Sequence, residues 1–440
     1  MTNLCVYGLW HLGSVTAACM AEHFPTVGID PDPAVIDGLR DGRPPISEPG
    51  LEELIRRGRA AARLEFSAEL ARVATANVVW VTFDTPVDQD DRADVESVVR
   101  HVERLFPHLA DGAVVLLSSQ VPVGTTARLE AAFAAVAGGR RVAFACSPEN
   151  LRLGKAIEVF RTADRIVVGT RTLEARGPLE ALLAPLGRPI LWVSTESAEM
   201  TKHAVNAFLA TSVVFINELA AACEATGADA KEVERGLKTE SRIGPGAYLG
   251  PGAAFAGGTL ARDVAFLLGM GERLGFSTPL LAGVKQSNDV HRGWARRRLA
   301  ELLGPLRGKT IAVLGLTYKP GTDTLRRSES VALCRWGVEE GAIVRAHDPA
   351  IDPSIRDKTP ELAGPLILCG TVEEAIAGTD AIVVATEWPA FRALTADRIA
   401  ADAPGALVLD ANRFLSAGLA QDARIRYVAV GTGKRSTTRT

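Results

Sequence analysis

The chain has 440 residues, of which 47% are hydrophobic and 23% charged, and its formal net charge at pH 7 is −3. This composition is ordinary for a globular protein, and the length predicts two or three domains. The nearly balanced charge argues against nucleic acid or an anionic membrane as a partner. The six cysteines have no paired spacing, so we expect small buried hydrophobes, with no disulfide framework and no metal site.

The two ends of the chain give no targeting signal. The N-terminal MTNLCVYG enters a predicted strand at once, without the basic segment and apolar core of a signal peptide. No uncharged apolar run reaches about 18 residues, so we expect no membrane span and a cytoplasmic location. Residues 433–440 are polar and basic without periodicity, and we expect a disordered tail there.

The first third alternates short apolar runs with amphipathic stretches. This alternation predicts a parallel sheet with helices on both faces. The expected helices cover residues 48–61 and 94–106, and the expected strands cover residues 4–8, 26–30, 76–83, 113–119, 142–148 and 165–170.

The pattern changes near Glu196, where apolar residues recur at helical spacing over residues 196–227. We expect one long helix or two nearly joined helices. Such a helix favours a dimer interface in a helical central domain, although it could also be buried inside a monomer. The alternation then returns, with strands expected at residues 309–318, 342–349, 366–370, 380–388 and 406–414.

The fold class that follows is α/β, with two Rossmann-like doubly wound domains joined by a central, mainly helical dimerisation domain. The predicted domains cover residues 1–195, 196–300 and 301–432.

The first loop, VYGLWHLGSVTAA, keeps Gly8 and Gly13 of a G-x-G-x-x-G pattern, but Trp10 takes the place of the middle glycine. That glycine normally lets the backbone approach a pyrophosphate. Asp30 ends the second predicted strand, where a carboxylate accepts hydrogen bonds from the ribose hydroxyls of NAD and repels the extra phosphate of NADP. The loop and Asp30 together predict an NAD site. The alternative is a doubly wound domain that no longer binds a dinucleotide.

In the last third, Gly315 follows a predicted strand, and Lys319 and Arg326 come shortly after it. Basic side chains at the carboxyl end of a strand suit a phosphate or diphosphate, although they could belong to a solvated loop. We expect no acidic ribose binder at the end of the next strand in the way that Asp30 ends the second, although Asp348 lies nearby.

Lys202 and Asn206 are four residues apart in the predicted long helix and therefore share a face. A partly desolvated lysine can act as a general base, and an asparagine can donate to a developing oxyanion. An exposed polar strip is the alternative. We interpret the neighbouring His203 as a packing or surface residue.

The combined motifs resemble the nucleotide-sugar dehydrogenases, the UDP-glucose and GDP-mannose 6-dehydrogenase family. They include VYGLWHLG, GRPPISEPGLEELI, VPVGTT, SPENLRLGKA, TKHAVNAFLATSVVFINELA, SRIGPGAYLGPGAAFAGGTLARDV, LGLTYKPGTDTLRRS and ATEWPAFR. The resemblance implies a Rossmann NAD domain, a helical dimerising centre and a Rossmann-like UDP or GDP domain. It also implies a nucleotide-linked substrate and a homodimer formed through the central helix.

The resemblance also implies roles for individual residues. The cofactor-binding set is Gly8, Trp10, His11, Leu12, Gly13, Asp30, Thr85, Pro86 and Gln120. The catalytic set is Lys202, Asn206, Asp263, Glu149 and Thr259. The substrate-binding set is Asn150, Leu151, Arg152, Arg242, Tyr248, Gly257, Gly258, Lys319 and Arg326.

The chain departs from this family in the catalytic loop. The family reads G-G-S-C-F-P-K-D, and its cysteine forms a thiohemiacetal and then a thioester. Here the loop is one residue shorter and Thr259 stands at the cysteine's place. Gln120 replaces the threonine of S-T-V-P-V-G-T, and Leu153 and Asn150 replace a glutamate and a phenylalanine of P-E-F-L-R-E.

A threonine hydroxyl has too high a pKa to replace a thiolate without a strong neighbouring base, and its β-branching restricts its approach. We therefore expect Thr259 to pack or to hydrogen-bond substrate. Lys202 and Asn206 suffice for one hydride transfer, as in the related β-hydroxyacid dehydrogenases. The hypotheses, in order, are an NAD-dependent single oxidation to an aldehyde or ketone, a full oxidation to a uronic acid through a hydrated aldehyde, and a non-catalytic nucleotide-sugar binder.

Overall fold

The computed structural model describes residues 2–86, 93–149, 151–256, 258–317, 319–325, 328–354, 359–362 and 364–433. The chain divides into two compact units, Met1–Asn206 and Ala207–Thr440, and each is described by itself. Three residues predicted for the site, Asn150, Gly257 and Arg326, lie outside the described residues, as do residues 434–440 of the predicted tail. The predicted domain boundaries stay predictions.

The first unit holds an eight-stranded sheet in the order β3-β2-β1-β4-β5-β6-β7-β8. Its neighbouring strands are parallel except β6 and β7, which pair antiparallel, so the expectation of a wholly parallel sheet is corrected at that pair. The strands are β1 Leu4–Tyr7, β2 Thr26–Ile29, β3 Leu64–Ser67, β4 Val78–Val81, β5 Val114–Leu117, β6 Ala143–Cys146, β7 Ile166–Thr170 and β8 Ile190–Val193.

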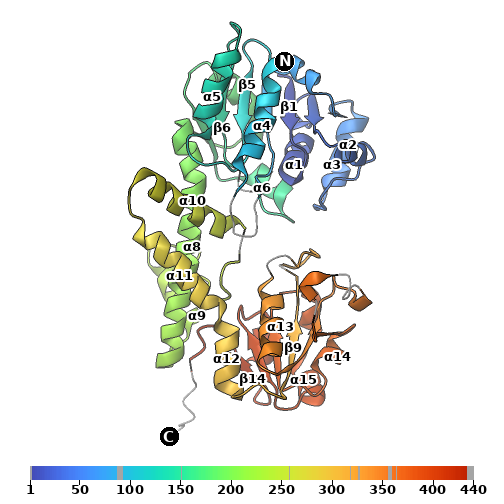
Figure 1. The fold of residues 1–440 in the computed structure, drawn as a ribbon, viewed down its shortest axis with the longest axis vertical. Helices are drawn as coiled ribbons and strands as arrows, with labels where there is room; N and C mark the ends of the chain where they lie inside the picture. Colours follow the sequence, from blue (N-terminus) through green and yellow to red (C-terminus); the bar gives the residue numbers. More distant parts are fainter. Residues whose placement is uncertain are drawn as a thin grey trace. The chain divides into compact units, whose positions relative to one another are not determined.

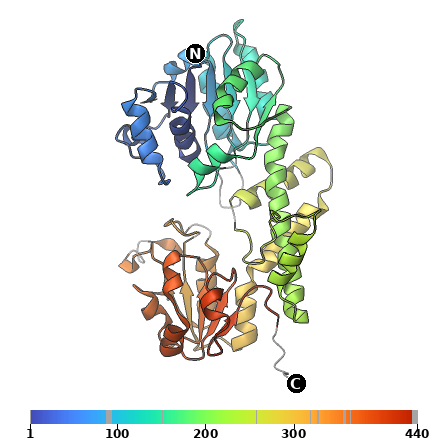
Figure 2. The ribbon, with the colours of Figure 1, turned by 180° about the vertical axis from the view of Figure 1, so that it is seen from behind.

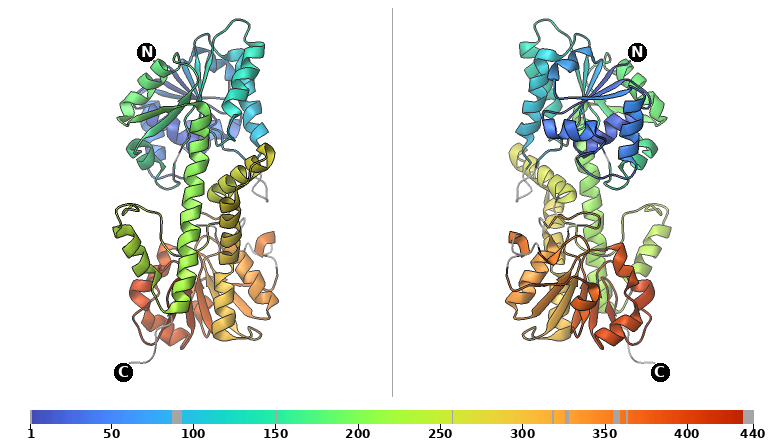
Figure 3. Two further views of the ribbon diagram at one scale, coloured as in Figure 1. Left: turned by 90° about the vertical axis from the view of Figure 1, so that its left-hand side faces the viewer. Right: turned by 90° about the vertical axis from the view of Figure 1, so that its right-hand side faces the viewer.

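Two layers of helices cover the faces of this sheet (Figure 3). Successive residues of a strand point to opposite faces, so Leu4 and Val6 of β1 pack on one side and Cys5 and Tyr7 on the other. The first side is covered by α1 His11–Met20, α2 Pro33–Arg40, α3 Leu51–Ala60, α6 Ala156–Thr162 and α7 Arg176–Leu183. The other side is covered by α4 Val95–Leu105 and α5 Thr125–Val136.

The predicted long helix is confirmed as α8, Thr195–Thr226, a single helix of 32 residues (Figures 1 and 3). In the second unit its side chains Ala210 and Val214 pack against Val264 and Val284. The last two belong to α10 Thr259–Leu274 and α11 Pro279–Arg292, and α9 Ala230–Thr239 and α12 Trp294–Leu303 complete the helical segment.

Among the described residues, α8 is the one helix that is long and apolar enough to cross a membrane, by length and composition alone. Its most apolar stretch is 44% buried within the protein, and the core helix of a water-soluble protein meets the same criteria.

The second unit holds a six-stranded parallel sheet in the order β11-β10-β9-β12-β13-β14 (Figure 2). Its strands are β9 Thr310–Leu314, β10 Ile343–His347, β11 Ile367–Leu368, β12 Ala381–Val384, β13 Leu407–Asp410 and β14 Arg426–Val428. Its helices are α13 Glu329–Glu339, α14 Val372–Ile376, α15 Ala396–Asp402 and α16 Ser416–Leu419. Short 3-10 helices occupy Leu70–Thr75, Phe106–His108, Ala184–Leu186, Pro360–Leu362 and Pro389–Ala393 of the chain.

Both sheets place their first strand beside the second and fourth, which is the Rossmann arrangement with its switch point next to the first strand. The predicted fold class is thereby confirmed as two Rossmann-like α/β domains with a helical segment between them in the chain. All six cysteines are buried and free, as expected of small hydrophobic residues.

Candidate active site

The loop between β1 and α1 contains two glycines that cannot be replaced without a clash. Gly8 has φ +97°, and a Cβ there would lie 2.8 Å from the Phe83 ring. A Cβ on Gly13 would lie 1.8 Å from the carbonyl oxygen of Gly8. Trp10, at the place of the middle glycine, precedes α1 with φ −70° and is 46% exposed. The tryptophan therefore fits without an unusual backbone, and the tight turn that a pyrophosphate loop needs is kept.

Asp30 follows β2 and is nearly buried beside this loop. Its Oδ2 accepts a hydrogen bond from the Leu9 amide at 2.6 Å, and its Oδ1 accepts one from the Asp32 amide at 2.9 Å. A carboxylate offers about four lone-pair positions, so two remain for the hydroxyls of a ribose. The first turn of α1 carries no acidic side chain, which suits a diphosphate at the helix N-terminus. These residues fit a bound dinucleotide.

Further members of the predicted cofactor set lie on the loops after β4 and β5. The Thr85 hydroxyl donates to the Gln120 carbonyl oxygen at 2.5 Å, which joins the two loops. Pro86 is exposed, and its carbonyl oxygen accepts from the Asp94 amide at 2.8 Å. Leu12 is buried in the first turn of α1.

Lys202 is brought into contact with Glu149. It is only 9% exposed, and its Nζ donates to the Glu149 carbonyl oxygen at 2.5 Å and lies 3.3 Å from the Glu149 carboxylate Oε1. The other carboxylate oxygen accepts from the Leu151 amide at 2.5 Å. The structure thus brings together three residues that the sequence predicts for chemistry or sugar binding, while Arg152 is exposed.

Asn206 lies one turn further along α8 and is also buried. His203 is buried, with its Nε2 3.1 Å from the Val121 carbonyl oxygen, so it packs within the unit as expected.

A cavity of about 10 Å³ adjoins Lys202 and is lined by Ser118, Ser119, Gln120, Val121, Cys146, Pro148, Glu149, Glu199 and Lys202. Burial raises the pKa of the Cys146 thiol far above its usual value, so Cys146 does not supply a thiolate near neutral pH.

Glu199, which the sequence reading missed, is 2% exposed and lines the same cavity. Burial raises its pKa, although its carboxylate accepts from the Gly124 amide and from the amide and hydroxyl of Thr126. Its position three residues before Lys202 on the helix is the signal that could have revealed it.

The remaining candidates belong to the second unit. Asp263 is fully buried within α10, and Gly258, with φ +98°, immediately precedes that helix. Thr259 is the exposed first residue of α10, so it begins a helix rather than lying within a loop. Arg242 is exposed with its Nε 2.9 Å from Glu240 Oε1, and Tyr248 is 56% exposed. Lys319 is half-buried.

Asp348 stands directly after β10, the strand that corresponds to β2 in the other sheet. Its Oδ2 accepts from the amides of Leu316 and Thr317, the Thr317 hydroxyl and the Trp388 indole, at 2.7 to 3.0 Å. Its Oδ1 accepts from the Ala350 amide at 2.8 Å. Oδ2 is therefore fully used and Oδ1 keeps one position, which is too few for the two hydroxyls of a ribose.

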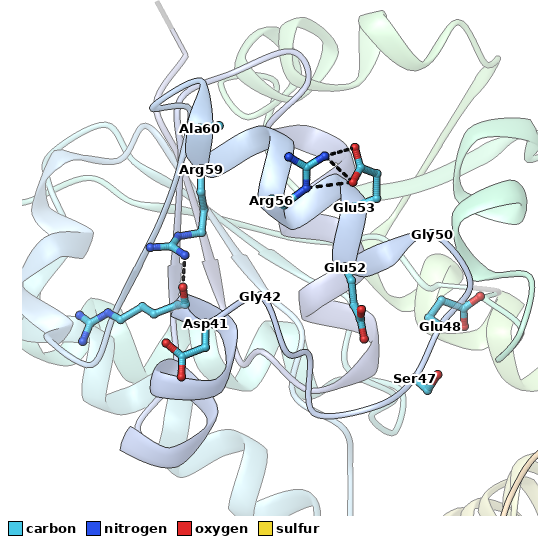
Figure 4. Close-up of a pocket in the computed structure, with 11 residues that line it drawn as sticks. Asp41, Gly42, Ser47, Glu48, Gly50, Glu52, Glu53, Arg56, Arg59 and Ala60 are labelled. Carbon is cyan, nitrogen blue, oxygen red and sulfur yellow. Dashed lines mark hydrogen bonds and ion pairs between the residues drawn. The ribbon is translucent and has the colours of Figure 1, made fainter.

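Two of the other cavities are not lined by Lys202. One of about 120 Å³ in the second unit adjoins the carboxyl ends of β12 and β13 and the start of α13, and its lining includes His291, Arg292, Arg296, Glu329 and Asn412. The other, of about 930 Å³, lies between the 40–50 segment and α3 of the first unit (Figure 4). None of the residues predicted for the site lines this larger cavity, and its Arg56 is held by Glu53 at 2.6 Å.

The chain matches the UDP-glucose/GDP-mannose dehydrogenase family in three successive parts. Residues 2–187 match its NAD binding domain, residues 196–290 its central domain and residues 312–417 its UDP binding domain.

Characterised relatives match along nearly the whole chain. A UDP-glucose 6-dehydrogenase of Pseudomonas aeruginosa is 35% identical over 444 residues, covering 98% of this chain and 97% of that protein. The UDP-glucose 6-dehydrogenase YwqF of Bacillus subtilis is 33% identical over 435 residues, covering 98% and 97%.

Solved structures of nucleotide-sugar dehydrogenases have the same fold as this chain. A UDP-glucose dehydrogenase from Pyrobaculum islandicum has a TM-score of 0.84 and 31% identity, with 98% of both chains covered. A UDP-D-ManNAc dehydrogenase from Pyrococcus horikoshii has the same TM-score at 22% identity, which shows the shared fold alone. With Gly8, Gly13 and Asp30 in a dinucleotide-binding arrangement, the chain belongs to the UDP-glucose/GDP-mannose dehydrogenase family of NAD-dependent enzymes that oxidise an alcohol of a nucleotide sugar.

Proposed function

We propose that this protein oxidises the alcohol of a nucleotide sugar by one hydride transfer and releases an aldehyde or ketone. The observation that carries the proposal is the lack of a usable thiolate among the described residues around Lys202. Thr259 stands where the resemblance implies a nucleophilic cysteine, and Cys146 beside Lys202 is a buried thiol whose pKa is raised by burial. Without a thioester, the aldehyde has no covalent route to the acid.

Lys202 is the proposed base. Its amine would take the hydroxyl proton while the carbon–hydrogen bond breaks, and NAD, when bound, supplies the hydride acceptor. The contacts with the carbonyl and carboxylate of Glu149 fix the position of Nζ. Asn206 would donate to the developing oxyanion from the next turn of α8, and Asp263 would organise the reacting groups.

NAD would be held by the β1–α1 loop, the start of α1, Asp30 and the loops that Thr85 and Gln120 join. The sugar would contact Leu151, Arg152 and Gly258, and the nucleotide would contact Arg242, Tyr248 and Lys319. The relatives named UDP-glucose 6-dehydrogenases support UDP-glucose as the first substrate to test.

Those relatives also favour a second candidate, the complete oxidation to a uronic acid. In this chain it would need attack by water on the aldehyde rather than by a cysteine. A second oxidation of a hydrated aldehyde would give the acid and a second NADH.

The number of NADH molecules formed per sugar distinguishes the single oxidation from the complete oxidation. The protein is incubated with excess NAD and limiting UDP-glucose, with GDP- and CDP-linked sugars in parallel, and NADH and product mass are followed to completion. One NADH per sugar and a hydrazine-trappable aldehyde support the proposal. Two NADH per sugar and a uronic acid overturn it.

A single substitution sharpens the result. Thr259→Cys should leave the yield at one NADH per sugar, because Gln120 and Leu153 also depart from the family's motifs. A yield of two in this variant would show that the missing cysteine alone limits the reaction.

We also propose a cytoplasmic homodimer that forms through α8. The exposed aromatic side chains Phe208 and Phe215, at 69% and 47%, are seven residues apart and therefore lie on one face of the helix. The six free cysteines agree with a reducing compartment. Light scattering of the purified protein measures the assembly, and a monomeric mass at micromolar concentration would contradict the dimer.

A further inference from the structure

We propose that Glu48 is a positioning residue that links the dinucleotide loop to the segment lining the sugar site, so that filling one site favours filling the other. This inference rests on the proposed function, because it takes the β1–α1 loop as the NAD site and Glu149, Leu151 and Arg152 as part of the sugar site.

The Glu48 carboxylate joins two elements that are far apart in the sequence. Its Oε2 lies 2.9 Å from the His11 ring Nε2, which must be the donor because an ionised carboxylate only accepts. The same oxygen accepts from the Gly154 amide at 2.8 Å, and Oε1 accepts from the Ala156 amide at 2.9 Å. One side chain thus bridges the first residue of α1 and the start of α6.

This bridge is buried and charged. The Glu48 side chain is 1% exposed and the His11 side chain 16%. Burial alone would raise the pKa of Glu48, but the hydrogen bonds from His11, Gly154 and Ala156 outweigh it and lower the pKa. Glu48 is therefore ionised at neutral pH, and hydrogen bonds to a charged acceptor are about twice as strong as neutral ones.

Each end of the bridge adjoins a predicted binding element. His11 follows the Gly8–Trp10 turn and begins the helix whose N-terminus would face the pyrophosphate. Gly154 has φ +88°, and it follows the segment in which Glu149 binds Lys202 and the Leu151 amide. The position of Glu149 therefore depends on Lys202, and the positions of Gly154 and Ala156 depend on Glu48.

The hydrogen bonds of Glu48 are made to protein groups that do not line the neighbouring cavity, although Glu48 itself lies on the rim of that cavity. Figure 4 shows Glu48 and Gly50 at one end of that cavity, with Asp41 and Arg59 at the other. All three donors to Glu48 lie outside the cavity lining. Glu52, on the same rim, is exposed and provides a matched control carboxylate.

The physical consequence is a coupling between the two ligands. A dinucleotide that orders the start of α1 also orders His11, and through Glu48 it orders the Gly154 and Ala156 amides. A sugar that binds Glu149, Leu151 and Arg152 then binds a segment that is already partly ordered, so less conformational entropy is lost on binding. Coupling of this kind is reciprocal, and it commonly changes affinity by about fivefold or more.

The test measures NADH binding by fluorescence, with and without saturating UDP-glucose, a pair that cannot react. We expect UDP-glucose to tighten NADH binding at least about fivefold in the wild type. Glu48→Gln should reduce that factor to below about twofold, because an amide cannot accept three hydrogen bonds in the same geometry. His11→Ala should reduce it as well, and Glu52→Gln should leave it unchanged.

Hydrogen exchange supplies a second measurement that needs no turnover. NADH should slow exchange in residues 151–157 of the wild type, and it should not do so in Glu48→Gln, although both proteins bind NADH. If Glu48 had a purely structural role, Glu48→Gln would exchange faster in this segment and be less stable, but NADH would still slow the exchange.

The outcomes are separable. If the wild type neither binds NADH nor oxidises a nucleotide sugar, the proposed function fails. If it does both and Glu48→Gln keeps the full coupling factor and the NADH-dependent protection, the inference about Glu48 is overturned. Thermal unfolding of each variant identifies any that fails to fold, and His11→Ala, which leaves Gly154 and Ala156 bound to Glu48, then provides the decisive result.

Discussion

The two Rossmann-like sheets of this chain begin with the same construction and differ in one carboxylate. Each first strand ends at a glycine of positive φ, Gly8 at +97° and Gly315 at +94°. Each second strand is followed by an aspartate that accepts the amide just after that glycine, Leu9 for Asp30 and Leu316 for Asp348. Asp30 accepts from two backbone amides, whereas Asp348 accepts from five donors, including the Trp388 indole.

Strand order and a correctly placed acid therefore do not by themselves predict a ribose site. What decides it is how many of the carboxylate's lone pairs the protein already uses. In the first sheet the aspartate can still bind a ligand, while in the second it stabilises the loop after β9. Trp388, from beyond β12, supplies one of the donors that make this difference.

The largest expected effect is a loss of kcat on replacing Lys202 in the first unit, which contrasts with a rise in KM on replacing Lys319 in the second unit. Lys202→Met should lower kcat by about 10²–10⁴-fold, the range for loss of a general base, and should leave NADH affinity unchanged. Lys319→Met should mainly raise the KM for the nucleotide sugar, as expected for a group that binds ground and transition states equally. Steady-state NADH formation checks both, and an equal loss of kcat in Lys319→Met would contradict this division.

The next effect tests the two aspartates against each other. Asp348→Ala leaves several buried donors unpaired, so it should lower the free energy of unfolding by about 3 kcal/mol while the Kd for NADH stays unchanged. Asp30→Ala should weaken NADH binding about 10–100-fold, because hydrogen bonds to a charged group contribute about 1.5–3 kcal/mol. Urea unfolding and NADH fluorescence provide the measurements. A loss of NADH affinity in Asp348→Ala would show that the second aspartate also serves a dinucleotide.

The smallest effect concerns stability against pH. Burial raises the pKa of Glu199 in the folded protein above the pKa of 4.5 in the unfolded chain. The contribution of Glu199 to the free energy of unfolding is therefore fully present below pH 4.5 and is lost as pH rises through the pKa of the folded protein. Glu199→Gln should therefore gain stability relative to the wild type on going from pH 4.5 to neutral.

Asp380 in the second unit should behave in the opposite sense. Burial would raise its pKa, but hydrogen bonds from the Thr310 amide and Lys309 lower it. The contribution of Asp380 to the free energy of unfolding is present above the pKa of 3.8 in the unfolded chain and is lost as pH falls through the pKa of the folded protein. Asp380→Asn should flatten the acid side of the stability curve, and urea unfolding from pH 3 to 8 compares the two. The same sign of pH dependence in both variants would contradict the assignment.

Much of the fold could be predicted from the sequence, because the periodicity of apolar residues is a local property. Central strands such as Val78–Val81 and Val114–Leu117 are continuous apolar runs buried on both faces, and both were expected. The strands that escaped prediction, β3, β8 and β14, lie at the edges of their sheets, where fewer side chains are buried and the apolar signal is weaker. The antiparallel β6–β7 pair depends on chain direction, which no residue pattern records.

For the site, the sequence by itself predicted the glycine loop, Asp30, the shared face of Lys202 and Asn206, and Thr259 at the place of a cysteine, and these roles stay predictions. Only the tertiary structure decided that Lys202 touches Glu149, that Cys146 adjoins it as a buried thiol, and that Asp348 already accepts from five donors. The same holds for Glu48, whose partners are 37 to 108 residues away along the chain. The physical reason is that a pattern of residue types fixes which face is apolar, whereas the partners of a buried charge are fixed by how distant segments pack.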